Sequence, residues 1–148
     1  MPPDRARGPK HRDVFSKKKR SQIMSRIRSK NTSLDLAMKK ALRKAGIKFK
    51  MYPKMIGSPD FLVGDRTVIF CDSSFWHGRN WTELRSQLQR GSNSSYWVKH
   101  IARNIKRDRI VTRTLRKFGY QVVRFWESDI YERPQTCLRK LKRIHGGI

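Results

Sequence analysis

Residues 60–71 read DFLVGDRTVIFC, and this run restricts the fold more than any other part of the chain. Two apolar segments, 60–63 and 68–71, flank the turn sequence GDRT at 64–67. β-Branched and aromatic residues on both sides of a glycine-containing turn predict an antiparallel hairpin. Because the second segment is apolar throughout, we expect this hairpin to lie in the buried part of a sheet.

The other elements follow from helical periodicity and turn residues. Thr32 resembles an N-cap, with Asp35 three positions later, and Gly46 ends that helix. Further helices are predicted at residues 80–90, at 96–118 and from Pro134 onward. Further strands are predicted at 47–52, where apolar and basic residues alternate, and at 120–126, and residues 91–95 are predicted to be a flexible linker.

This order of elements predicts an α/β fold. The long helix at 96–118 connects the third strand to the fourth, so the fourth should run parallel to a strand beside it. We therefore expect a mixed four-stranded sheet with helices on both faces. At 148 residues the chain should form a single domain, residues 16–148, preceded by a flexible basic arm at 1–15.

The charge of the chain predicts a polyanionic partner. Lysine and arginine number 36 against 11 acidic residues, for a formal net charge of +25. Such self-repulsion is relieved on a phosphate backbone, where binding also releases counterions. The basic run at 17–20 fits this surface better than a nuclear import signal. The charge does not distinguish an enzyme from a packing protein.

Other functional classes are not indicated. No apolar run approaches the roughly 20 residues of a membrane span, and the N-terminus lacks the apolar region of a signal peptide. The two cysteines have no CxxC spacing, so a reducing, cytoplasmic and nucleoid-associated setting is expected.

Two acids frame the hairpin. Asp60 opens its first strand and Asp72 ends its second, so their carboxylates can meet at one edge of the sheet. Together with a backbone carbonyl they would suit Mg²⁺, although each alone also fits an ordinary turn acid. His77 could move a proton, or be a plain loop residue. Asp35 fits the first turn of a helix on dipole grounds alone.

The aromatic pair Phe75-Trp76 has two interpretations that the residues leave open. Both side chains adjoin serines and the sequence His-Gly, which are typical of a loop. They could pack in the core, or they could wedge between base steps of DNA. Trp97 fits a core anchor, with the same alternative.

Several motifs in order resemble the very short patch repair (Vsr) endonucleases. The match runs from about residue 16 to residue 130. The motifs that carry it are SPDF at 58–61, VIF at 68–70, FWHG at 75–78, YW at 96–97, the stretch 101–104, RDR at 107–109 and WE at 126–127. FWHG directly after a buried strand is the most specific of these motifs.

The resemblance implies a restriction-endonuclease-like fold of the PD-(D/E)xK type. It implies an enzyme that uses Mg²⁺ to nick duplex DNA beside a T·G mismatch, leaving a 5′-phosphate. We expect one or two Mg²⁺ ions, and a monomer, since nothing in the sequence suggests an obligate oligomer. Two alternatives remain: a nuclease of the same fold for another mismatch, deaminated base or DNA structure, and a non-catalytic nucleic-acid-binding protein.

The resemblance also implies roles for single residues. Asp60 matches the metal-binding aspartate, Cys71 the residue whose backbone carbonyl holds metal, and Asp72 a position beside the metal. His77 matches the catalytic histidine and Asp35 the acid that supports it. The intercalating aromatics correspond to Phe75, Trp76 and Trp97. The remaining DNA-binding candidates are Met24, Asn104, Lys17, Lys18, Lys19, Arg20, Arg26, Lys30 and His100.

Two departures from the family pattern matter. The cysteine-rich positions that hold a structural zinc in the family are Ser74, Arg79 and Ser128 here, so no zinc is expected. Residues 80–90, with Trp81, are the expected replacement for that brace. At Lys99-His100 the family more often has an acid followed by lysine, which leaves the choice of mismatch open.

Overall fold

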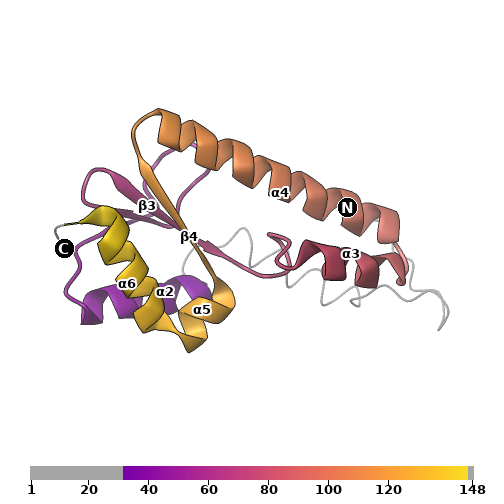
Figure 1. Ribbon diagram of the computed structural model, residues 1–148, viewed down its shortest axis with the longest axis horizontal. Coiled ribbons are helices and arrows are strands. Elements are labelled where there is room, and N and C mark those ends of the chain that lie inside the picture. The colour runs from indigo at the N-terminus through magenta and orange to yellow at the C-terminus, as the bar shows by residue number, and fades with distance from the viewer. Residues whose placement is uncertain (1–31, 147–148) are drawn as a thin grey trace.

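The predicted hairpin forms the middle of the sheet in the computed structural model of the protein, which describes residues 32–146 (Figure 1). The predicted arm at 1–15 and the DNA-binding candidates between 17 and 30 lie outside the described residues. The elements are α2 (Ser33–Lys44), β1 (Lys50–Met51), β2 (Phe61–Val63), β3 (Thr67–Asp72), α3 (Trp81–Gln89), α4 (Ser94–Lys117), β4 (Gln121–Trp126), α5 (Glu127–Glu132) and α6 (Pro134–His145).

The four strands lie in the order β1-β2-β3-β4. β2 and β3 pair antiparallel through the predicted turn, with Phe61 opposite Ile69. β3 and β4 pair in parallel over six residues, from Thr67 opposite Gln121 to Asp72 opposite Trp126. The prediction of a mixed four-stranded sheet with a parallel last strand is therefore confirmed.

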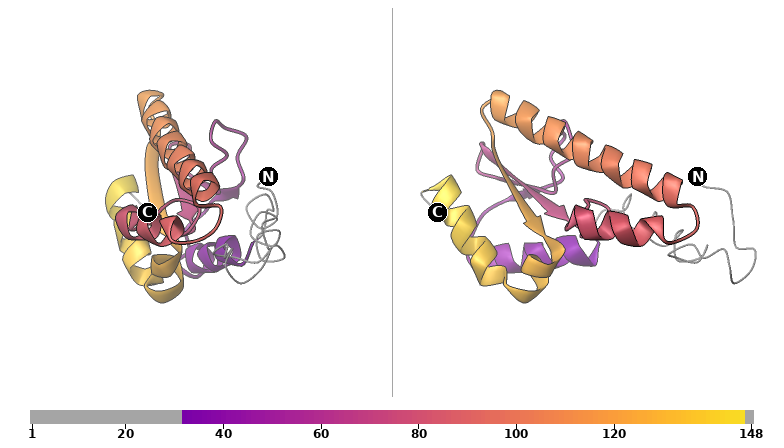
Figure 2. Two further views of the ribbon diagram at one scale, coloured as in Figure 1. Left: turned by 90° about the vertical axis from the view of Figure 1, so that its right-hand side faces the viewer. Right: turned by 45° about the vertical axis from the view of Figure 1, so that its right-hand side comes forward.

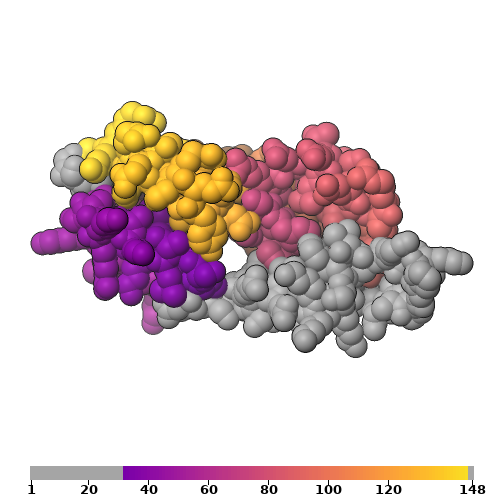
Figure 3. Space-filling model, turned by 90° about the horizontal axis from the view of Figure 1, so that it is seen from below, coloured from indigo at the N-terminus to yellow at the C-terminus, as the bar shows by residue number. Residues whose placement is uncertain are grey.

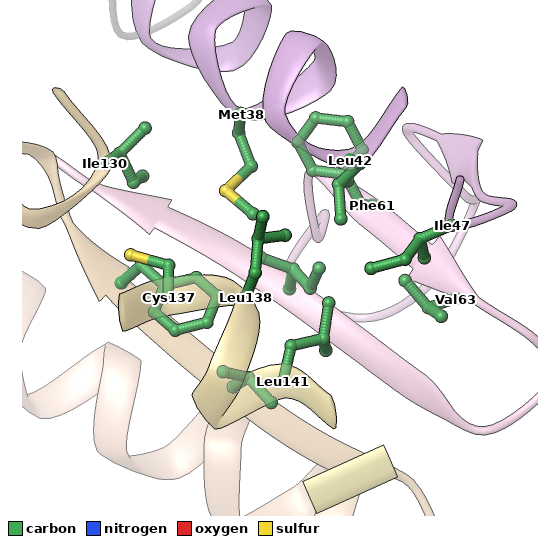
Figure 4. Packing of buried hydrophobic residues seen from close by; sticks show 12 residues of the cluster. Met38, Leu42, Ile47, Phe61, Val63, Ile130, Cys137, Leu138 and Leu141 are labelled. Atoms are coloured by element: carbon green, nitrogen blue, oxygen red, sulfur yellow. The ribbon is translucent and has the colours of Figure 1, made fainter. Parts of the chain in front are cut away.

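Helices cover both faces of this sheet, as predicted (Figure 1). On one face α2 and α6 pack on the strands, and the cluster between them includes Met38, Leu42, Phe61 and Leu141 (Figure 4). On the other face the second half of α4 covers Val68, Phe70 and Val122 through Leu115. Alternate residues of β3 pack on the two faces, which explains why residues 68–71 of this strand are all apolar.

A third hydrophobic cluster lies beyond the end of the sheet. The first half of α4 projects past the strands, and α3 packs along it (Figures 1 and 2). Their contact is formed by Trp76, Leu88, Trp97 and Ile101. We call α3, the first half of α4 and the loop at 73–80 the α3–α4 lobe.

The structure differs from the predictions at β1, at the start of α4 and at α5. Of residues 47–52 only Lys50 and Met51 form a strand, because β1 lies at the edge of the sheet and pairs only with β2. Two residues of the predicted linker, Ser94 and Ser95, belong to α4, which begins after the left-handed Asn93. α5 was not predicted, since only Ile130 of its six residues is buried and no side chain caps it.

In the part of the chain that the structure describes, no helix combines the length and the apolar character needed to cross a membrane. α4, although 24 residues long, has basic residues along its exposed side.

The α2 helix allows a matched test of the core. Leu42 is fully buried, whereas Leu36 on the same helix is 44% exposed. We expect Leu42→Ala to lower the free energy of unfolding by about 2–5 kcal/mol, because it leaves a cavity under the sheet. Leu36→Ala should change it by about 0.5 kcal/mol or less. Urea unfolding of both variants measures this, and equal losses would contradict the placement of α2.

Candidate functional site

The end of β3 directs two adjacent residues to opposite faces of the sheet. Side chains alternate along a strand, so Cys71 lies on the side of α2 and Asp72 lies on the side of α4. The packing agrees, since Cys71 contacts the cluster under α2 while Phe70, which shares the face of Asp72, packs in the cluster under α4. Each face at this point carries a separate group of ionisable side chains.

On the α2 face the group consists of Asp35, Asp60 and Cys71. One ligand atom from each, two carboxylate oxygens and the Cys71 sulfur, lies within 4.8 Å of the others. The Cys71 amide donates a hydrogen bond to Asp60 Oδ2 at 2.7 Å. The Tyr52 hydroxyl donates to Asp35 Oδ2 at 2.7 Å. Asp35 is in place because the Thr32 hydroxyl caps α2 and accepts from the Asp35 amide.

The electrostatics of this group favour a bound cation. Burial raises the pKa of Asp60 to about 7, and the charges of Asp35 and Asp72 add to the rise. The hydrogen bond from the Cys71 amide opposes it but does not cancel it. The buried Asp35 and the half-buried Asp60 bring two carboxylates together. A divalent cation would neutralise them, and carboxylate oxygens suit Mg²⁺. Asp35 and Asp60 are therefore the residues that could hold a metal.

On the α4 face His77 is held between acids. Its Nδ1–H donates to Asp108 Oδ2 at 2.5 Å and lies 3.7 Å from Asp72 Oδ1. Burial by itself would lower the pKa of His77, but the hydrogen bond to Asp108 and the charges of Asp72 and Asp108 outweigh it and raise the pKa. With Nδ1 bound to Asp108, Nε2 is the nitrogen that can exchange a proton with a substrate.

Arg124 on β4 balances these acids. Its Nη1 lies 3.1 and 3.2 Å from the two carboxylate oxygens of Asp72, and its Nε donates to Thr112 Oγ1 at 2.8 Å. The guanidinium also lies 4.0 Å above the Phe70 ring. Burial raises the pKa of Asp72, while His77 and Arg124 lower it, and the rise prevails.

The loop that carries His77 is pressed against α4. Gly78 has φ +67°, and a Cβ at this position would collide with the side chains of Ile101 and Ile105. Asn104, itself buried, donates from Nδ2 to the Trp76 carbonyl at 3.1 Å. Glycine is therefore required after His77, and the Asn104 side chain holds the loop backbone in this structure.

The aromatic residues next to His77 lie mostly in the core. Trp76 is 3% and Trp97 1% exposed, with ring centroids 5.8 Å apart, and Phe75 packs edge-on against both. In this conformation Trp76 and Trp97 cannot contact DNA without leaving the α3–α4 lobe. Phe75 is half-buried. Of the two interpretations left open by the sequence, the core one therefore describes both tryptophans in this structure.

His100 belongs to the rim of the same lobe. It stacks on Tyr96 at 5.5 Å and lies edge-on to Trp76 at 4.9 Å. Burial lowers the pKa of His100, and Arg103 and Arg107 lower it further. It is half-buried, so part of the imidazole remains accessible.

Two predicted relationships need correction. Asp35 was expected to support His77, but the carboxylate partner of His77 is Asp108, and Asp35 lies instead with Asp60. Asp72 was expected beside Asp60 as a metal ligand, yet strand alternation directs it to Arg124 and His77. Asp108 lies in the RDR motif, but spacing alone could not show that the fifteenth residue of α4 returns to the end of β3.

The three positions that depart from the family pattern lie side by side. Arg79 Nη1 donates to the Ser128 hydroxyl, and the Arg79 amide donates to the Ser74 carbonyl at 2.9 Å. The predicted replacement brace, residues 80–90, is α3, which contacts α4 through Leu88 and Trp81. The contacts at Ser74, Arg79 and Ser128 are a second brace that sequence reasoning missed.

Known proteins match the chain over most of its length. The family described as DNA mismatch endonuclease Vsr matches residues 12–83. The type II nicking enzyme V.NmeDIP of Neisseria meningitidis serogroup C is 32% identical over 133 residues, 88% of each chain. The DNA mismatch endonuclease Vsr of Escherichia coli K12 is 30% identical over 125 residues, 83% of this chain and 78% of the relative. The type II nicking enzyme V.HpaIIP of Haemophilus parainfluenzae is 29% identical over 134 residues, which are 88% of this chain and 94% of the relative.

The raised pKa of Asp60 predicts a pH dependence of stability. Because the folded state holds this proton more tightly than the unfolded chain, the stabilisation is complete below the ordinary value of 3.8. It is lost as the pH rises toward about 7. In EDTA, the free energy of unfolding of the wild type should therefore fall between about pH 4 and pH 7, relative to that of Asp60→Asn. Urea unfolding across this range measures it, and parallel curves would contradict the burial of Asp60.

The contact with Asp108 predicts a shift at His77. Asp108→Asn removes the charge that offsets burial, so the pKa of His77 should fall below its wild-type value. NMR titration of the His77 ring proton measures this. Asp65→Asn, in the exposed turn between β2 and β3, is the control. An unchanged pKa in Asp108→Asn would show that another group holds His77.

Proposed function

The chain belongs to the Vsr family of DNA mismatch endonucleases and is a DNA endonuclease, and from this premise we propose that it nicks one strand of duplex DNA beside a T·G mismatch in a Mg²⁺-dependent reaction. One observation carries the proposal. The end of β3 brings a pair of carboxylates, the buried Asp35 and the half-buried Asp60, and a carboxylate-bound histidine, His77, to the same point from opposite faces.

The histidine has the arrangement of a general acid–base group. Asp108 accepts from Nδ1, which fixes the tautomer and the ring orientation and leaves Nε2 for the reacting water or the leaving oxygen. Its raised pKa lies above the ordinary value of 6.5, so at neutral pH the ring holds a proton more readily than a free histidine. We infer that His77 transfers a proton at the scissile phosphate, with Asp108 as its positioning residue.

The carboxylates supply the place for Mg²⁺. Asp60 and Asp35, with the backbone carbonyl of Cys71, would hold one ion or two. A bound Mg²⁺ polarises a phosphodiester and stabilises the charge on a leaving oxygen. The pKa of Asp60, about 7 without a cation, supports this, because burial disfavours the charged carboxylate and a bound cation would offset that cost. Asp72, already neutralised by Arg124, is left to orient His77.

The basic surface of the lobe is suited to grip DNA. α4 exposes many cations along the side that faces away from the core, and its basic residues with exposed side chains are Lys99, Arg103, Lys106, Arg107, Arg109, Arg113, Arg116 and Lys117. Seen from below, the surface is hollowed between α2, α5 and α6 on one side and the α3–α4 lobe on the other (Figure 3). We propose that the duplex backbone contacts α4, where lysine and arginine neutralise its phosphates.

Recognition of the mismatch would start at Phe75 and His100. Both are half-buried at the surface of the aromatic cluster, which Trp76 and Trp97 support from within. An aromatic ring inserted by its edge between two base pairs would unstack them most easily where base pairing is already weak. We further propose that the core has a restriction-endonuclease-like fold and that the protein acts as a monomer, associated with the nucleoid in the cytoplasm. We also propose that it holds no structural zinc, and metal analysis of the purified protein would test this last point.

A panel of labelled duplexes tests the function. Wild-type protein with Mg²⁺ should nick a T·G duplex and leave a 5′-phosphate that a ligase can rejoin. U·G, matched and single-stranded DNA should be cut more slowly, and EDTA should stop the reaction. Asp60→Ala and His77→Ala should each lower the nicking rate by about 100-fold or more.

The control is Asp65→Ala, an exposed acid in the turn of the same hairpin, which should nick at the wild-type rate. If the protein nicked another mismatch faster than T·G, the proposed substrate would be wrong, but the proposed roles of Asp60 and His77 would stand. If Asp60→Ala nicked as fast as the wild type, the assigned site would be wrong.

A further inference from the structure

The segments that follow β3 and β4 lie side by side. The two strands are parallel and end in register, with Asp72 opposite Trp126. The chain therefore leaves the sheet at neighbouring points, into the loop at 73–80 after β3 and into α5 after β4. Neighbouring exits allow side chains of one segment to contact the other.

Three contacts join these segments. The Ser74 amide donates to Glu127 Oε1 at 2.6 Å. Arg79 Nη1 donates to the Ser128 hydroxyl, and the Arg79 guanidinium lies 5.5 Å from the centre of the Trp126 ring. We call this set the exit brace. It attaches the loop at both ends, since Ser74 and Arg79 lie on either side of His77.

The loop between these attachments is closed on itself. The His77 amide donates to the Ser73 carbonyl at 3.2 Å, and the Arg79 amide donates to the Ser74 carbonyl at 2.9 Å. His77 therefore lies inside a turn that the bond between Arg79 and Ser74 closes, so a displacement of either residue would also displace His77.

The two halves of the site belong to different parts of the molecule. His77, through Asp108 and Gly78, is bound to α4. Asp35 belongs to α2, which is joined to α5 by a hydrogen bond between the Ser33 and Tyr131 hydroxyls at 3.1 Å. Since α5 also begins with Glu127, the exit brace connects the part that holds His77 to the part that holds Asp35.

We propose that Glu127 and Ser128 are positioning residues that set the place of His77 relative to the carboxylate pair Asp35 and Asp60. This role rests on the proposed function. Without the brace, His77 would keep its contact with Asp108 on α4, but its position relative to α5 would no longer be fixed. The proton-transfer group would then be displaced from the scissile phosphate, while the duplex would still be bound.

Glu127→Ala and Ser128→Ala test the proposal. With the duplex that the wild type nicks, kcat should fall by about 10- to 100-fold, because an ångström of misplacement is enough for such a loss. KM for the duplex should stay within about twofold. The pKa of His77 should remain raised, which separates a moved histidine from a broken contact with Asp108. Glu127→Gln keeps an oxygen acceptor for the Ser74 amide and should restore most of kcat.

Glu132→Ala is the matched control, because Glu132 is an exposed acid of the same helix. Hydrogen exchange gives a readout without DNA: the Ser74 amide should lose protection in Glu127→Ala and keep it in Glu127→Gln. If Glu127→Ala unfolds, Ser128→Ala, which removes one hydroxyl, carries the test.

The proposal is overturned if kcat in both alanine variants stays within about twofold of the wild type, or if Glu127→Gln loses as much as Glu127→Ala. An equal loss in Glu132→Ala would also overturn it, since any change in α5 would then suffice. If the wild type cleaves no duplex, the proposed function fails, and unchanged Ser74 exchange in Glu127→Ala would reject the brace separately.

Discussion

The parallel pairing of β3 with β4 is the constraint on which the rest of the site depends. It aligns the ends of the two strands, and so it places Asp72 beside Arg124 and the loop with His77 beside the start of α5. A parallel pair requires a long crossover, and α4 provides it. The same helix then delivers Asp108 to His77. The connection that satisfies the topology also completes the acid–base pair.

Strand alternation then divides the chemistry into two groups. The adjacent β3 residues Cys71 and Asp72 face opposite ways. Asp35 and Asp60 lie beside Cys71 on the α2 face, and His77 lies beside Asp72 on the α4 face. Burial acts on both groups in opposite senses. It raises the pKa of Asp60 because the Cys71 amide and His77 offset its charge only in part, whereas at His77 the surrounding acids overcome the effect of burial. Two different ionic environments thus lie on either side of one strand.

Much of the fold was accessible from local pattern. The hairpin, the cap of α2 at Thr32, the proline that starts α6 and the parallel fourth strand were predicted, because each rests on short-range chemistry or on the handedness of a crossover. α5 was not predicted, because a helix of six residues with one buried side chain shows no helical periodicity of apolar residues. The proposed site residues Asp60 and His77 came from motifs in fixed order. The partner of His77 was assigned to Asp35 through the family resemblance, whereas in space the contact is made by Asp108.

The sequence by itself determined the chemistry: a chain of +25 charge, a buried hairpin framed by acids, and a histidine-glycine loop after it. Only the tertiary structure decided which groups work together. It brought Asp108 into contact with His77, Arg124 with Asp72, and Asp60 close to Asp35. It also placed Trp76 and Trp97 in the core. The physical reason is that local spacing encodes the direction of a side chain along its own helix or strand. The meeting of side chains from separate elements depends on how those elements pack.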